Sequence, residues 1–295
     1  MRTTGIGQQK LKSGSHVVKA KSEHIMNDKI TVIGAGMMGG AIVKSLLKSG
    51  YQGKITAVDI RPERLQEQEK LGASTSTDSR KAAADANILF IVVKPGDVKK
   101  VLSEVKDEVK GKLVISVAAT VPLKFVKKFI PDAKTVRIMP NVGALVQASY
   151  TAYCCDPSVT AEDKEKVKTL LNMMGICEEV DEKYMDAITA LSGSGPGYLS
   201  IIIEALMYAG LKVGLPRNVA LTSAAQTVLG TGKLVIELQE HPAKIKDMVT
   251  TPGGTTIEAI YELEGSQIRQ SLMRAVGEAA KKSQLIREQL GFNAE

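Results

Sequence analysis

The chain has 295 residues, of which 44% are hydrophobic and 24% charged, a balance typical of a globular protein and unlike a fibre or a disordered chain. The length suits two domains better than one small core. An aromatic content of 4%, without Trp, argues against a surface that stacks single-stranded nucleic acid. Three cysteines without metal-ligand spacing indicate neither a disulfide framework nor a zinc site, and fit a reducing cytoplasm.

The formal charge of +7 is concentrated at the N-terminus. Residues 1–26 carry a net charge of +4, which leaves +3 for the rest of the chain. We interpret them as a disordered leader: a vector-derived tag, a stretch before a true start at Met26, or a weak organelle-type presequence. Because the body is nearly balanced and Glu204 and Lys212 interrupt its most apolar stretch, we expect no nucleic-acid and no membrane partner.

The body opens with a strand, a glycine turn and a helix. The β-branched run Lys29–Ile33 leads into Gly34-Ala-Gly-Met-Met-Gly39 and then into a helical pattern. In this context the first glycine permits a tight turn, the second lets the backbone approach a pyrophosphate, and the third lets the helix lie close to its strand. The helix N-terminus then offers free amides to the phosphates. The cofactor-binding residues expected here are Gly34, Ala35, Gly36, Met37, Met38 and Gly39.

A second strand, Lys54–Asp59, ends in an acidic residue twenty positions after Gly39. An Asp at this spacing accepts hydrogen bonds from ribose hydroxyls and repels a 2′-phosphate, which favours NADH. Arg61 lies two residues later, where a guanidinium stacks on adenine or pairs with a 2′-phosphate, unless it is only a solvated loop charge. The cofactor predicted from these two residues is NADPH or NADH.

Three more strands are predicted at 88–93, 113–117 and 135–138, with helical connections between them. The alternation indicates an α/β, Rossmann-type doubly wound parallel sheet, whose ligands bind at the carboxyl ends of the strands. Lys94 there either meets phosphate or ribose oxygens or is an exposed turn lysine, and Asn141 either orients the carboxamide or caps a turn. The residues expected to face the cofactor are Val92, Val93, Lys94, Pro95, Val117, Ala118, Ala119 and Asn141.

From about Lys183 the pattern changes to long helical runs broken by Gly and Pro. We therefore expect a dinucleotide-binding domain at 27–183 and an all-α domain at 184–295. The helix that opens at Pro196 is apolar over too much of its circumference for a surface helix. It is buried either between two subunits or in the core of the chain.

The run Thr250-Thr-Pro-Gly-Gly-Thr-Thr256 places hydroxyls and unpaired amides at the start of a helix. Such an end is suited to an anion, and a carboxylate is the obvious candidate. The alternative is plain helix capping by threonine. The residues expected to bind the substrate are Thr251, Gly254, Thr255 and Thr256.

With these residues in view, the chain resembles the pyrroline-5-carboxylate reductases from Lys29 to about Leu290. The resemblance rests on segments that occur in order in one chain. They are the glycine turn, Val92-Val-Lys-Pro95, Arg137-Ile-Met-Pro-Asn141, Leu191-Ser-Gly-Ser-Gly-Pro196, Gly214-Leu-Pro-Arg217 and His241–Val249 running into Thr250–Thr256.

The resemblance implies a Rossmann domain followed by an all-α dimerisation domain. It also implies homodimers, which can assemble into a ring such as a decamer. It implies hydride transfer from NADPH or NADH to C5 of 1-pyrroline-5-carboxylate, which gives L-proline. By position, Thr256 is the catalytic hydroxyl that hydrogen-bonds the ring nitrogen, while Thr251 and the amides of 254–256 hold the carboxylate. The site would lie between the cofactor domain of one subunit and helices drawn partly from its partner.

The chain departs from the family pattern near the cofactor. Val142 and Gly143 follow Asn141 where the family often has Thr-Pro, and Ser79 stands where an Asn often contacts the adenosine. Asp59 replaces the small or amide residue common in enzymes that prefer NADPH. These differences leave the choice of cofactor open.

Two other kinds of protein remain alternatives. One is a related Rossmann imine or hydroxyacid reductase, although a hydroxyacid enzyme would need a catalytic lysine that the stretch 192–200 lacks. The other is a nicotinamide-binding regulator without chemistry, which would not need the anion site around Thr251 and Thr256.

Overall fold

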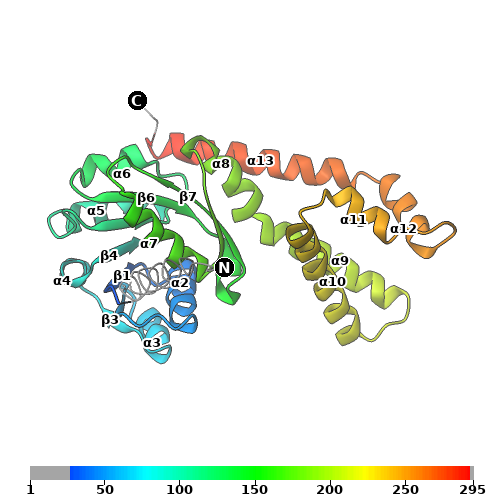
Figure 1. Cartoon of the computed structure of the whole chain (residues 1–295), viewed down its shortest axis with the longest axis horizontal. Coiled ribbons are helices and arrows are strands. Elements are labelled where there is room, and N and C mark those ends of the chain that lie inside the picture. The colour runs from blue at the N-terminus through cyan, green and yellow to red at the C-terminus, as the bar shows by residue number, and fades with distance from the viewer. Residues whose placement is uncertain (1–26, 293–295) are drawn as a thin grey trace, which may run out of the picture. The chain divides into compact units, whose positions relative to one another are not determined.

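The computed structural model describes residues 27–292, so the expected leader at 1–26 lies outside the described residues. Figure 1 shows the elements, which run in chain order as follows. They are β1 (Ile30–Ile33), α2 (Met37–Lys48), β2 (Ile55–Val58), α3 (Pro62–Lys70), β3 (Ser74–Ser76), α4 (Ser79–Asp85), β4 (Ile88–Ile91), η1 (Pro95–Asp97), α5 (Val98–Val105), β5 (Leu113–Ser116), α6 (Leu123–Phe129), β6 (Lys134–Met139), η2 (Val142–Val146), β7 (Ser149–Cys155), α7 (Ala161–Asn172), β8 (Gly175–Glu179), η3 (Glu182–Tyr184), α8 (Met185–Ile188), the π-helical turn η4 (Thr189–Gly193), α9 (Gly195–Lys212), α10 (Arg217–Leu238), α11 (Pro242–Met248), α12 (Thr255–Glu264) and α13 (Ile268–Gln289).

The strands form one eight-stranded sheet in the order β3-β2-β1-β4-β5-β6-β7-β8. The first six strands are parallel, which confirms the predicted doubly wound sheet. Strand β7 runs antiparallel to β6 and pairs in parallel with β8, so the last two strands at this edge run opposite to the other six. Neither of these two strands, nor the three-residue β3, was expected from the sequence.

Alternating side chains of the buried strands face two hydrophobic cores. In β4, Ile88 and Phe90 join the core formed with α2 and α7, whereas Leu89 and Ile91 join the core formed with α4, α5 and α6. Strands covered by helices on both faces read as continuous apolar runs, which is why these were evident in the sequence.

The described chain divides into two compact units, one holding the sheet and the other comprising residues 194–280. Residues 184–193 and 281–292 belong to the sheet unit, although the sequence analysis assigned both stretches to the helical domain. Polar and aromatic contacts explain the difference. Asp186 accepts from Arg287 Nη1 at 2.6 Å and from Ser283 Oγ at 3.0 Å. Phe292 is buried and lies edge-on to Phe125, with ring centroids 4.4 Å apart.

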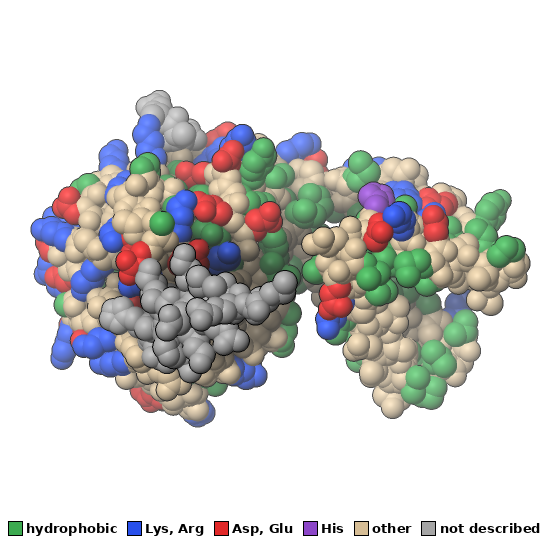
Figure 2. Space-filling model, viewed as in Figure 1, with side chains coloured by type: hydrophobic (Ala, Val, Ile, Leu, Met, Phe, Trp, Pro, Cys, Tyr) green, Lys and Arg blue, Asp and Glu red, His purple; other side chains and the backbone are tan. Residues whose placement is uncertain are grey.

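The helical unit contains α9 to α12 and the first part of α13. Helices α9 and α10 approach closely where Gly210 faces Ala220, since a Cβ at position 210 would collide with that alanine. Most of their apolar side chains are exposed in the single chain, and Met207 is the one buried residue of α9. Figure 2 shows apolar side chains on the surface of this unit. Within the described part of the chain, α10 alone has the length and composition of a membrane span, with 11% of its apolar window buried.

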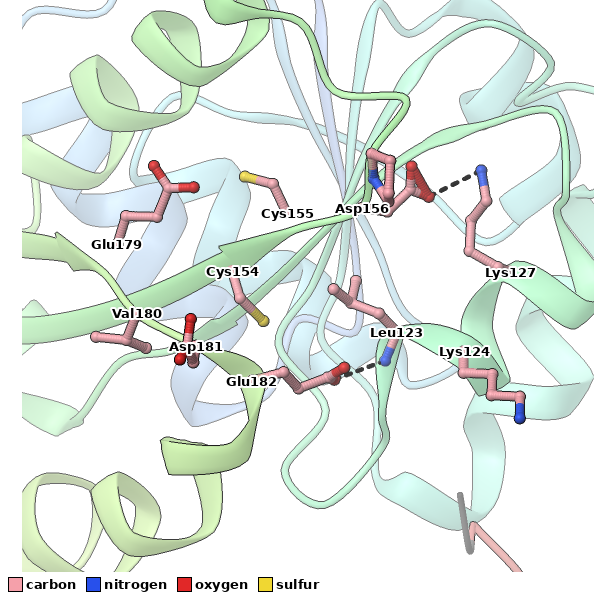
Figure 3. Close-up of a pocket in the computed structure, with 11 residues that line it drawn as sticks. Leu123, Lys124, Lys127, Cys154, Cys155, Asp156, Glu179, Val180, Asp181 and Glu182 are labelled. Carbon is pink, nitrogen blue, oxygen red and sulfur yellow. Dashed lines mark hydrogen bonds and ion pairs between the residues drawn. The ribbon is translucent and has the colours of Figure 1, made fainter. Parts of the chain in front are cut away.

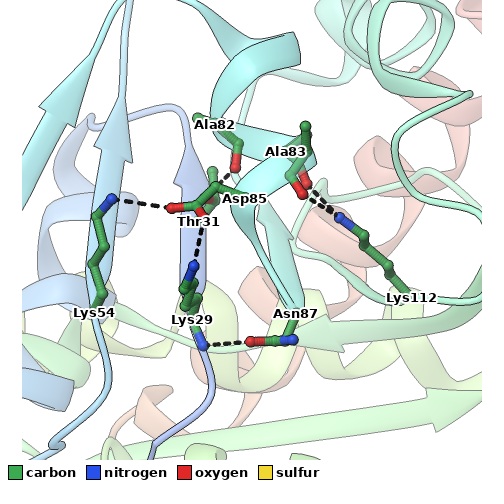
Figure 4. A network of polar contacts seen from close by, with 9 residues as sticks. Lys29, Thr31, Lys54, Ala82, Ala83, Asp85, Asn87 and Lys112 are labelled. Atoms are coloured by element: carbon green, nitrogen blue, oxygen red, sulfur yellow. Dashed lines mark hydrogen bonds and ion pairs between the residues drawn. The ribbon is translucent and has the colours of Figure 1, made fainter.

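A polar network closes the amino-terminal end of the sheet (Figure 4). Asp85 accepts from Lys29 Nζ at 2.6 Å and from Lys54 Nζ at 3.0 Å, which ties α4 to β1 and the start of β2. Lys112 Nζ donates to the carbonyl oxygens of Ala83 and Ala84 at 2.9 and 2.8 Å. The last carbonyls of a helix lack intrahelical partners and carry partial negative charge, so this ammonium group stabilises the end of α4.

We predict that Lys112→Met lowers the free energy of unfolding by about 1 kcal/mol, because both carbonyls lose a charged donor while the apolar stem remains. Chemical denaturation measures the change. Lys110→Met is the matched control, since Lys110 is 60% exposed and pairs with Asp107, which is 48% exposed. The control should leave the free energy nearly unchanged, and an equal loss in both variants would contradict this role for Lys112.

Candidate functional site

The strand order reverses between β1 and β4, and such a switch point opens a crevice at the carboxyl ends of the strands. A hollow of about 650 Å³ lies there in the sheet unit. Its walls come from the turns after β1, β2, β4 and β5, with one side formed by α5. The expected residues that line it are Gly34, Gly36, Met37, Met38, Asp59, Arg61, Ser79, Val92, Val93, Lys94 and Val117.

Six of the residues expected to bind the cofactor do not line this hollow. Gly39 lies in α2, where a Cβ would collide with the carbonyl oxygen of Gly34. The absence of a side chain at this position therefore lets α2 pack close to the end of β1. Asn141 Oδ1 accepts from Gly143 N at 2.9 Å and its Nδ2 donates to Ser192 O at 3.2 Å, so its side chain caps η2. The other four outside the lining are Ala35, Pro95, Ala118 and Ala119.

Several other residues that line this hollow were not expected from the sequence. Arg64 projects from the first turn of α3, two positions after Pro62. Four of them, Asp97, Lys100, Val101 and Glu104, lie on or just before α5 at helical spacing. This spacing would have predicted that they share one face of the helix. The missed residues are Ile33, Val58, Ile60, Arg64, Asp97, Lys100, Val101 and Glu104.

Asp59 is the central polar group of the hollow, with a side chain only 5% exposed. Its Oδ2 accepts from the backbone N–H of Ala35 at 2.9 Å, and its Oδ1 from that of Arg61 at 3.0 Å. Arg61 Nε lies 3.4 Å from Oδ1, and Arg64 Nη1 lies 3.5 Å from Oδ2. The carboxylate thus joins the turn after β1 to the turn after β2.

The glycine turn presents a helix N-terminus to the hollow. Gly34 adopts φ +99, a conformation that side chains rarely adopt, and a Cβ there would also collide with the Val92 carbonyl oxygen. Gly36 is the N-cap of α2 and has no side chain to satisfy the first amides. Free amides and a positive helix end are the groups that bind a pyrophosphate, so the residues present fit a dinucleotide.

We predict that Asp59→Ala lowers the free energy of unfolding by about 1 to 3 kcal/mol, because the amides of Ala35 and Arg61 lose their acceptor. Denaturant titration of the protein without cofactor measures it. Asp97→Ala is the control, since Asp97 lines the same hollow, is exposed and makes no side-chain cap at α5. Equal stability of Asp59→Ala and the control would refute this structural role.

The residues expected to bind the substrate lie in the helical unit, at the start of α12. Gly254 is the N-cap, and its N–H donates to Thr251 O at 3.0 Å, which closes a turn through Gly253 at φ +68. A Cβ at position 254 would collide with the Thr251 hydroxyl oxygen, so that hydroxyl lies against the N-cap glycine.

The threonine hydroxyls of this turn are not used as helix caps. The N-cap of α12 makes no side-chain hydrogen bond, and the hydroxyls of Thr251, Thr255 and Thr256 have no partner among residues 27–292. By contrast, Thr250 Oγ1 donates to the Lys246 carbonyl at 2.8 Å. Three hydroxyls and the first amides of α12 are therefore available to a ligand.

A second hollow of the sheet unit, about 670 Å³ in volume, lies beside the end of β7 (Figure 3). Burial raises the pKa of the Cys154 thiol to about 12 and that of the Cys155 thiol to about 11, so both stay protonated at neutral pH. Asp156 pairs with Lys127 at 2.9 Å, and Glu182 accepts from Leu123 N at 2.7 Å. The two thiols are therefore neutral, and the carboxylates of Asp156 and Glu182 are each held by a donor.

The described part of the chain contains one histidine, His241, and it lies at the start of α11. His241 Nδ1 accepts from Ala243 N at 3.2 Å and caps α11. Across residues 27–292, no three His, Cys, Asp or Glu side chains gather in a way that would hold a metal ion.

Comparison with known proteins matches a different family model to each part of the chain. The description "Pyrroline-5-carboxylate reductase dimerisation" matches residues 182–286, and "NADP oxidoreductase coenzyme F420-dependent" matches residues 29–120. A pyrroline-5-carboxylate reductase of Methanosarcina acetivorans is 40% identical over 87% of this chain and 97% of its own length. That of Arabidopsis thaliana is 38% identical over 86% and 94%.

Solved structures agree with these relatives. The pyrroline-5-carboxylate reductase of Coxiella burnetii superposes with a TM-score of 0.80 and 32% identity, covering 88% of this chain and 98% of its own. The Plasmodium falciparum pyrroline carboxylate reductase with NADP bound gives 0.79 and 29% over the same shares.

Proposed function

The chain belongs to the pyrroline-5-carboxylate reductase family, and we propose that it reduces 1-pyrroline-5-carboxylate to L-proline with NADPH or NADH. One observation carries the proposal: 40% identity with a named relative over 87% of this chain and 97% of the relative's own length. The proposal thus rests on the whole chain and not on the glycine turn alone.

The bound nicotinamide supplies a hydride, and the chain's own residues bind and orient the two reactants. The amides at the start of α2 would hold the pyrophosphate, and Asp59, Arg61 and Ser79 would surround the adenosine end. The nicotinamide end of the cofactor would then lie toward the turns after β4 and β5, where Val93 and Val117 line the hollow.

The α12 turn binds the carboxylate of the imine. The first amides of the helix and the Thr251 hydroxyl donate to it, and its negative charge faces the positive end of the helix. The Thr256 hydroxyl hydrogen-bonds the ring nitrogen. A cyclic imine protonated on nitrogen is already electrophilic at C5, so hydride addition there yields the amine of proline without a histidine acid.

The exposed apolar faces of α9 and α10 support a homodimer built through the helical unit. Together with the dimerisation match over residues 182–286, they favour shared helices over a membrane or nucleic acid as the partner. We assign the protein to the cytoplasm, as dimers that can assemble further into a ring such as a decamer.

We predict that the purified protein oxidises NADPH or NADH only when 1-pyrroline-5-carboxylate is supplied. Absorbance of the reduced nicotinamide follows the reaction, and amino-acid analysis identifies proline as the product. A 3-hydroxyacid offered with the oxidised cofactor is the control and should give no reaction. Absence of proline with both cofactors would end the proposal.

We predict that Thr256→Ala lowers kcat/KM for the imine by about 10- to 100-fold, which corresponds to the loss of one hydrogen bond of about 1 to 3 kcal/mol. Thr256→Ser is the matched variant, since it keeps the hydroxyl and should retain most of the activity. If alanine and serine variants both turn over as the unmodified protein does, Thr256 contributes only to the helix.

A further inference from the structure

We propose that Asn141 is a positioning residue for the reaction, because its side-chain amide holds the π-helical turn η4 against the carboxyl end of β6. We call the contact between Asn141 and Ser192 the η4 latch. The inference rests on the proposed function, in which the nicotinamide end of the cofactor would lie toward this end of the sheet. Both residues of the latch belong to the sheet unit.

Asn141 lies at the edge of the sheet where the crevice opens. Strand β6 pairs in parallel with β5, and Arg137 lies opposite Ser116. The residue after Ser116 is Val117, which lines the hollow. Because the carboxyl ends of parallel strands meet at one edge of a sheet, the turn that Asn141 opens after β6 is the neighbour of the turn after β5.

The side-chain amide of Asn141 uses both of its ends. Its Oδ1 accepts from Gly143 N at 2.9 Å, and its Nδ2 donates to the carbonyl oxygen of Ser192 at 3.2 Å and to the Ser192 hydroxyl at 3.1 Å. An N–H needs an acceptor and a carbonyl needs a donor, so these partners decide the orientation of the amide. One side chain therefore joins η2 to η4.

The backbone on both sides of the latch is held as well. Asn141 N donates to Ser149 Oγ at 3.0 Å, which fixes the start of η2 to β7. A Cβ at Gly193 would lie 2.7 Å from Met139 Cε, so η4 packs directly against the last residue of β6. The Thr189 hydroxyl donates to the Met185 carbonyl oxygen at 2.7 Å, which ties the first residue of η4 to α8.

The far part of η4 depends on the latch because its largest side chain is not packed. Leu191 is 64% exposed, whereas Ala190 is fully buried. The polar contact of Ser192 with Asn141 is therefore the main restraint on the end of the turn. π-Helical turns are rare and are found frequently at functional sites, where they place a short segment that a regular helix would not.

The chain leaves the sheet unit directly after η4, at Ser194. The turn that binds the substrate belongs to the unit that the chain then enters. Freedom at this junction would leave each binding site intact but allow the two reactants more orientations, which slows hydride transfer. A weakened latch should therefore lower the turnover number and leave nucleotide binding unchanged.

The test uses Asn141→Asp in the full chain. This change keeps the Oδ1 acceptor that caps η2 and replaces the donor to Ser192 with a second oxygen. Asn141→Ser is the second variant, since a serine hydroxyl can still cap η2 but is too short to reach Ser192. We expect both to lower kcat for the imine by about 10- to 100-fold.

The turnover number is expressed per nucleotide site, with the sites counted by calorimetric titration with adenosine diphosphate ribose, which lacks the nicotinamide ring. A purely structural loss would reduce the number of sites and leave kcat per site unchanged. The affinity for this nucleotide should stay as in the unmodified protein. Asn87→Asp is the matched control, because Asn87 Oδ1 accepts from Lys29 N at 2.8 Å at the opposite end of the sheet, and it should keep full turnover.

Hydrogen exchange separates the latch from the proposed function, since it needs no turnover. Amides of residues 189–194 should exchange about tenfold faster in both Asn141 variants and at the unmodified rate in Asn87→Asp. Unchanged exchange in the Asn141 variants would overturn the inference whatever the activity. An unchanged kcat per site, or an equal fall in the control, would overturn it too.

Discussion

The hydrogen bonds that Asp59 accepts from the backbone of Ala35 and Arg61 define the geometry of the cofactor crevice. These amides follow two neighbouring parallel strands, β1 and β2, and a buried carboxylate holds both turns at one separation. The start of α2, the position of Arg61 and the approach of Arg64 all depend on this clamp. A buried carboxylate needs such donors, because an unpaired charge away from water is strongly destabilising.

The parallel half of the sheet could be predicted because its strands are buried on both faces and therefore read as apolar runs bounded by turns. Strands β7 and β8 could not be predicted in the same way. Strand β7 mixes Ser, Thr and Tyr with small residues, and Ile176 and Glu178 of β8 are exposed, so neither has the continuous apolar pattern of β4. Their pairing is set by tertiary contacts, above all the register of β7 on β6.

The glycine turn and Asp59 could be located from spacing alone, because the distance between the ends of adjacent strands is fixed by the βαβ unit. The contacts of Asp59 could not be predicted in this way, since the four donors around its carboxylate come together only in the fold. Asn141 is a second example. From the sequence it could either orient the carboxamide of the cofactor or cap a turn, and its contacts in the structure are those of a cap. The helix at 195–212 likewise had two interpretations, and its exposed apolar face in the single chain favours burial between subunits.

Helix α13 begins in the helical unit and ends in the sheet unit, where Arg287 pairs with Asp186 and Phe292 enters the core. The helical unit is therefore an insertion within the sheet domain and not a module appended to it. A truncation that removed everything after Gly193 would also take away a core side chain and an ion pair of the nucleotide-binding half. Grafting this unit between related proteins would need two junctions, one at the π-helical turn η4 and one near Lys281, and a transplant with one junction would leave a buried aspartate without its cation.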